Sequence, residues 1–65
     1  MIEIIIEQST NAEGEPTFQW TVWDEDQQIE IGRTTHFSAD RCEESAVEYC
    51  WSQLGYKPDK VSRHQ

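Results

Sequence analysis

The longest periodic stretch of the chain is residues 38–55, SADRCEESAVEYCWSQLG, in which apolar positions recur with the spacing of one helix face. At about 100° per residue these positions fall on one arc, and polar residues occupy the opposite side. The apolar arc consists of Ala39, Cys42, Ala46, Val47, Tyr49, Cys50 and Leu54. Ser38 or Asp40 can cap the start of this helix, and Gly55 can adopt the left-handed conformation that ends it. Because one helix cannot bury such an arc alone, the pattern predicts a sheet beneath it.

Three stretches ahead of the helix alternate apolar and polar residues with the period of a β-strand: residues 1–8, 17–23 and 29–34. In the first two, every second side chain is predicted to share the face that packs on the helix. These side chains are Ile2, Ile4, Ile6, Phe18, Trp20 and Val22. The connections STNAEGEP and DEDQQ are polar and rich in turn formers, so strands adjacent in sequence should pair. The predicted fold class is α+β, with a three-stranded antiparallel β-sheet packed against one α-helix.

The domain prediction is a single βββα domain over residues 1–56, followed by a basic C-terminal tail, residues 57–65. The tail is either a frayed end or one additional weak strand around Val61. A chain of 65 residues buries only about 60% of the surface that its unfolded form exposes, so its stability is expected to be modest. Formation of a homodimer would add to that stability.

The charge of the chain is strongly negative, with 13 acidic and five basic side chains and a net charge of -8. It is also uneven, because residues 1–56 contain only two of the basic side chains and residues 57–65 contain three. A negative body favours basic partners and opposes approach to nucleic acid or to an anionic membrane. We therefore expect a basic protein as the partner, with no direct nucleic-acid contact and no membrane contact.

Residues 18–49 resemble the short βββα unit of the YegP-like domains. The resemblance lies in the Phe18-x-Trp20-x-Val22 strand, in Phe37-Ser38, and in Cys42-Glu43 followed by Ala46-Val47. It covers about half of the chain. Where that family has an Asn-Gly hairpin and a lysine-rich character, this chain has DEDQQ and an acidic surface. The resemblance implies a fold, and it implies no catalytic residues.

The predicted outer sheet face and its neighbouring turn gather carboxylates around two apolar side chains. Same-face residues stand about 6.6 Å apart along a strand and neighbouring strands about 4.8 Å apart, so these carboxylates would form a two-dimensional anionic array. Such an array can imitate nucleic-acid phosphates, while Trp23 and Ile5 supply the apolar anchor. The predicted contact residues are Glu3, Ile5, Glu7, Trp23, Asp24, Glu25, Asp26 and Glu30, or Arg41, Glu44 and Glu48 if the helix is used instead. The alternative is a solvated face on which Trp23 is half covered by its neighbours.

Catalytic chemistry has one candidate, Cys42 in the first turns of the helix, where the helix dipole can lower a thiol pKa, with His36 six residues upstream. The alternative is an inert thiol buried on the apolar arc. Cys42 and Cys50 are eight residues apart, a separation of roughly 12 Å along a helix. This exceeds the limit of roughly 7 Å for a disulfide, so reduced thiols are expected.

Metal binding has a weak candidate in Asp24, Asp26 and Glu30, whose hard oxygen ligands suit calcium or magnesium. Their spacing lacks the glycine and the ligand order of a calcium loop, so a solvated turn is the alternative. We expect no metal and no cofactor. We expect no leader segment ahead of the first alternating strand and a cytoplasmic location.

These patterns favour a non-enzymatic protein-binding module over an enzyme. The predicted function is inhibition of a basic nucleic-acid-binding protein, such as a nuclease complex, by imitation of nucleic acid. Small phage anti-defence or anti-CRISPR-like proteins are analogous in size and charge. The alternative is a small accessory or regulatory subunit without catalytic activity, which could form a homodimer with Trp23 and Ile5 as an apolar seam.

Overall fold

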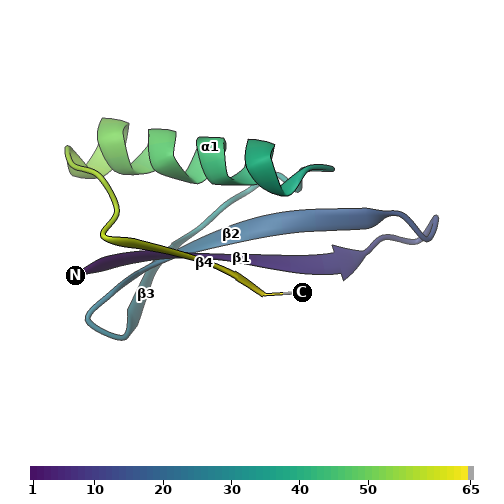
Figure 1. The fold of residues 1–65 in the computed structure, drawn as a ribbon, viewed down its shortest axis with the longest axis horizontal. Coiled ribbons are helices and arrows are strands. Elements are labelled where there is room, and N and C mark those ends of the chain that lie inside the picture. The colour runs from purple at the N-terminus through teal and green to yellow at the C-terminus, as the bar shows by residue number, and fades with distance from the viewer. Residues whose placement is uncertain (65) are drawn as a thin grey trace.

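A computed structural model describes residues 1–64 and places one helix over one face of a four-stranded mixed sheet (Figure 1). The strand order is β3-β2-β1-β4, with β1 antiparallel to β2, β2 antiparallel to β3, and β4 parallel to β1. The strands are β1 (Ile2–Thr10), β2 (Pro16–Asp24), β3 (Gln27–Ile31) and β4 (Lys60–His64). The helix consists of α1 (Ala39–Tyr49) and a continuing π-helical turn, η1 (Cys50–Leu54).

The predicted α+β class, the first three antiparallel strands and the single helix are confirmed, but the sheet has a fourth strand. The alternative of an additional strand around Val61 is therefore the one found. β4 begins where the backbone N–H of Asp59 donates to the Ile2 carbonyl at 2.8 Å, and the Asp59 carboxylate accepts from the Ile2 N–H at 2.8 Å. The last residue of the predicted tail, Gln65, lies outside the described residues.

The core lies between the helix and the two central strands, β1 and β2. Its buried members are Ile2, Ile4, Ile6, Trp20, Val22, Cys42, Ala46 and Cys50. The Trp20 indole closes one side of this core, donating to Ser45 Oγ at 3.3 Å and lying 5.3 Å from the Tyr49 ring between centroids. The helix covers one face of the sheet, and the opposite face has no element over it within residues 1–64 (Figure 1).

Both ends of the helix form as the sequence predicts. The Ser38 hydroxyl accepts from the Arg41 N–H at 3.4 Å, and Gly55 ends the helix with φ 82°. The wider last turn is unforeseen, with the Gly55 N–H donating to the Cys50 carbonyl five residues back at 2.8 Å. No helix in residues 1–64 combines the length and the apolar character needed to cross a bilayer.

A β-bulge changes which side chains of β3 share a face with β2. The register shifts between two adjacent residues, so that Val22 pairs with Glu30 whereas Trp23 pairs with Gln28, which leaves Ile29 as the extra residue. Directly paired residues point to the same side of a sheet, and Val22 is buried under the helix. The prediction that Glu30 lies on the outer face is therefore wrong, because the extra residue reverses the alternation.

Candidate functional site

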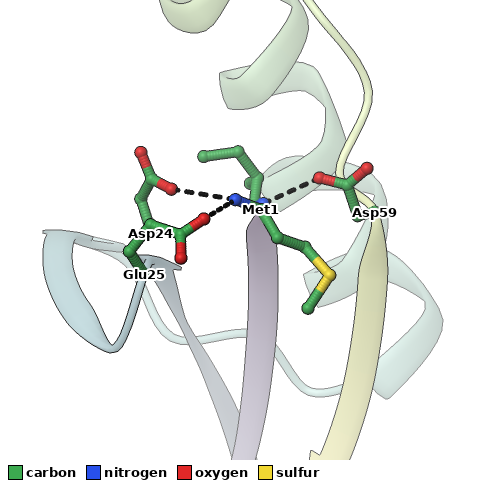
Figure 2. A network of polar contacts seen from close by, with 5 residues as sticks. Met1, Asp24, Glu25 and Asp59 are labelled. Atoms are coloured by element: carbon green, nitrogen blue, oxygen red, sulfur yellow. Dashed lines mark hydrogen bonds and ion pairs between the residues drawn. The ribbon is translucent and has the colours of Figure 1, made fainter.

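The amino end of β1 is held between carboxylates from two different parts of the chain (Figure 2). The Met1 amino group donates to Asp24 at 3.2 Å and to Glu25, while Asp59 receives the next backbone N–H. The hydrogen bonds to Glu25 and then Asp24 raise the pKa of the Met1 amino group. Asp24 and Glu25, two of the predicted contact residues, therefore already have an internal cationic partner.

Five of the predicted contact residues do come together on the outer face of the sheet. We call this region the sheet hollow: an open depression of about 470 Å³ lined by Met1, Glu3, Ile5, Trp23, Glu25 and Asp26. Ile5 and Trp23 are both half-buried, and the Trp23 indole is oriented by donating to the Thr21 hydroxyl at 3.0 Å. The structure thus joins the predicted apolar pair to three of the predicted carboxylates.

The outer face is less acidic than predicted because β4 brings basic side chains beside β1. The Glu3 carboxylate accepts from the Ser62 hydroxyl at 2.8 Å and lies 3.9 Å from Lys60 Nζ. Farther along the same pair of strands, His64 lies in register with Glu7. The predicted anionic array is therefore interrupted, and part of its charge is balanced within the chain.

Two more of the predicted contact residues lie apart from the sheet hollow. Glu7 lines a separate, smaller depression of about 160 Å³ farther along β1 and β2. Glu30 lies on the helix side of the sheet beside Tyr49, whose pKa is raised by burial first and by the neighbouring Glu30 second. The sheet residues therefore do not form one continuous contact surface.

A second candidate surface lies on the exposed side of the helix. We call it the helix surface: an open hollow of about 390 Å³ lined by Glu43, Glu44, Val47, Glu48 and Trp51. Trp51 is 53% exposed, and Val47 is half-buried. Within residues 1–64, no Lys, Arg or His nitrogen and no amino terminus lies within 4.0 Å of the carboxylate of Glu44 or Glu48.

Glu44 and Glu48 are among the contact residues predicted from the sequence, but Trp51 is not. A signal was available, because Trp51 follows Val47 by four residues and Glu44 by seven, the spacing of neighbours on one helix face. Trp51 also lies outside the apolar arc, so the helix pattern left no buried place for it. A large aromatic side chain without a place in the core is a better signal of a contact surface than the carboxylates alone.

The structure bears on both the thiol candidate and the metal candidate. Cys42 and Cys50 are free thiols with no exposed surface, and burial raises the pKa of both, opposed at Cys42 by the nearby Arg63. A raised pKa is the opposite of what activates a thiol nucleophile. Among residues 1–64, no three His, Cys, Asp or Glu side chains are placed to hold one metal ion.

No family model, no curated protein and no solved structure matches this chain. The resemblance to YegP-like domains stays a prediction made from residues 18–49. One fold supports many functions, so the surfaces of this chain indicate its function better than its fold does.

Proposed function

We propose that the protein is a non-catalytic binding module whose helix surface docks onto a basic, nucleic-acid-binding protein and competes with the nucleic acid for it. The net charge of -8 supports a basic partner, because it draws such proteins and repels nucleic acid. The helix surface adds what charge alone lacks, an exposed aromatic side chain beside an aliphatic one.

One observation carries the proposal: Trp51 is more than half exposed beside two carboxylates, Glu44 and Glu48, that have no cationic partner within residues 1–64. On the outer sheet face, by contrast, Glu3 is near Lys60 and Glu25 binds the amino group. A partner's basic side chains would therefore gain more at the helix surface than at the sheet.

The two parts of the helix surface have different roles in the proposed binding. Covering the exposed half of Trp51 is worth on the order of 3 kcal/mol before ordering costs, at about 25 cal/mol for each Å². The exposed carboxylates contribute mainly to the rate of association and to the choice of partner. The proposed anchor is thus Trp51, and the proposed steering groups are Glu44 and Glu48.

The test is affinity capture from a cell extract at low salt with three baits: the wild type, E44Q/E48Q and the control E13Q/E15Q. The two double variants lose the same charge, but only the first loses it from the helix surface. We expect a basic protein to be retained by the wild type and by E13Q/E15Q and to be lost from E44Q/E48Q. The captured protein, once purified, should release bound DNA or RNA when the wild type is added.

Two results would contradict the proposal. Equal loss of the captured protein from both double variants would show that net charge acts without a defined surface. A captured protein that keeps its nucleic acid when saturated with the wild type would show that the two ligands do not compete.

The uncovered outer face of the sheet favours a second candidate, a homodimeric accessory subunit. Ile31, which pairs with Thr21 of β2, is 45% exposed, and Ile5 and Trp23 are half-buried around the sheet hollow. Lys60 offsets the charge of Glu3 on this face, which lowers the repulsion between two copies that approach through it. Sedimentation over a range of concentrations tests it: a dimer that dissociates in the I31K variant supports the candidate, and a wild-type monomer at all concentrations rejects it.

A further inference from the structure

The helix surface has the chemistry of a site for arginine, and this inference rests on the proposed function. Its hollow of about 390 Å³ combines two apolar residues, Val47 and Trp51, with the acidic residues Glu43, Glu44 and Glu48. An indole face attracts a cation placed over it, and Arg occupies such positions more often than Lys. We infer that the occupant is an arginine side chain of the basic partner, stacked on Trp51 and paired with Glu44 and Glu48.

The chain itself shows that a guanidinium binds to this helix. Arg63 reaches from β4 and donates to Asp40 and Glu43 at 2.9 Å each. These two acceptors are three residues apart on the helix, and one planar group spans them. Glu44 and Glu48, one turn apart on the neighbouring part of the helix, present a similar pair of acceptors without a donor in the described chain.

Repulsion between the unpaired carboxylates of Glu44 and Glu48 favours the binding of a cation between them. Like charges four residues apart on a helix are about 5–6 Å apart at Cβ and destabilise the helix. A guanidinium between Glu44 and Glu48 would remove that repulsion and would also offer several N–H donors in a fixed plane. The ammonium group of lysine is more strongly hydrated and lacks the planar face that stacks on an indole. The site should therefore prefer arginine to lysine at equal charge.

The test compares hexaarginine with hexalysine as probes, using titration calorimetry and the NMR signal of the Trp51 indole N–H. We expect hexaarginine to bind the wild type about three- to tenfold more tightly than hexalysine. Hexaarginine should shift the Trp51 indole signal more than the Trp23 indole signal on the opposite face. The preference should fall in W51F and disappear in W51A, while E44Q/E48Q should weaken the binding of both peptides more than E13Q/E15Q does.

If Glu44 and Glu48 had a purely structural role, E44Q/E48Q would bind the peptides less well because it is less stable, and its Tm would fall. The arginine site predicts a different result. Because the repulsion is removed, E44Q/E48Q should have an unchanged Tm or one raised by about 1–4 °C, even though it binds the peptides less well. Both Trp51 variants should keep the far-UV spectrum of the wild type, since the side chain is mostly exposed.

The failures of the two proposals are distinguishable. Equal affinity for the two peptides, or a preference that survives in W51A, overturns the inference about arginine. If capture of the basic protein still depends on Glu44 and Glu48, the proposed function then stands. If the peptides are discriminated but the captured protein keeps its nucleic acid, the arginine site stands and the proposed function is overturned.

Discussion

Gly32 lies against the indole of Trp20 so closely that a β-carbon on Gly32 would stand 2.6 Å from Cε2 of that ring. Trp20 is 6% exposed and is held by its bond to Ser45 and its contact with Tyr49, so the ring has little room to move. We expect G32A to lower the free energy of unfolding by about 1–3 kcal/mol, the usual cost of overpacking. Urea denaturation followed by Trp fluorescence measures it.

A double-mutant cycle separates this clash from a general effect of replacing glycine. In W20V the indole atoms nearest to Gly32 (Cε2, Nε1 and Cδ2) are removed, so G32A should cost less in the W20V background than in the wild type. The same cost in both backgrounds would show that the Trp20 ring is not what excludes a side chain at position 32.

Asp59 fixes the start of β4 through its bonds to Ile2. In D59A the backbone N–H of Ile2, a residue only 2% exposed, loses its acceptor. An unpaired buried donor costs about 1–3 kcal/mol, so we expect a loss of stability in that range and faster exchange of the Ile2 amide hydrogen. D59N keeps an acceptor oxygen and should recover part of the loss. E7A is the control: it removes an exposed carboxylate from β1, the strand that contains Ile2, and should change the free energy of unfolding by less than about 0.5 kcal/mol. Equal effects of D59A and E7A would argue against the role of Asp59.

The turn between β2 and β3 contains backbone strain that a glycine would relieve. Glu25 has φ 49° and Asp26 has φ 65°, and both lie in the left-handed region where residues other than glycine are disfavoured. We expect D26G to stabilise the protein by up to about 1 kcal/mol, because glycine adopts this conformation without a steric cost.

Gly14 provides the converse test, since it has φ 82° and open space around it. G14A should destabilise by about 1 kcal/mol, and a destabilised D26G together with a neutral G14A would contradict the assignment of strain.

The sequence predicted the parts of the fold that are governed by burial under the helix. Ile2, Ile4, Ile6 and Val22 alternate as predicted because β1 and β2 lie directly beneath the apolar arc of the helix. In β3 the same alternation gave the wrong face for Glu30, because the bulge inserts Ile29. A bulge in an edge strand depends on how the strand twists against its neighbour, and a period of two contains no sign of it.

The fourth strand was visible in the sequence only as an alternative, because its stabilising contacts are distant in sequence. Val61 is its only aliphatic residue and is 36% exposed, so hydrophobic pattern contributes little. What holds β4 is polar: Asp59 to Ile2, Ser62 to Glu3, and Arg63 to the helix. The charge of the candidate site likewise depends on contacts that are distant in sequence. Carboxylates could be counted from the sequence, but whether Lys60 lies beside Glu3 or elsewhere depended on the parallel pairing of β4.

The two buried thiols predict loss of stability at alkaline pH. Burial raises the pKa of Cys42 and Cys50 in the folded protein above the ordinary value of 9.0. Below that value both thiols are protonated in the folded and the unfolded chain, so their contribution to stability is fully present. As pH rises above about 9, only the unfolded chain releases these protons. Each thiol then lowers the free energy of unfolding by about 1.4 kcal/mol per pH unit until the folded pKa is reached.

Urea denaturation between pH 8 and 10 measures this decline, and C50A is the matched variant. The Met1 amino group also titrates at alkaline pH with a raised pKa, and it contributes equally to both proteins. We expect the free energy of unfolding to fall less steeply with pH in C50A, by about 1.4 kcal/mol per pH unit, because one thiol fewer releases a proton on unfolding. At neutral pH a thiol-specific reagent should label both cysteines no faster than the protein unfolds, because neither has exposed surface. Rapid labelling of the folded protein, or identical slopes for the wild type and C50A, would show that these thiols are not buried as described.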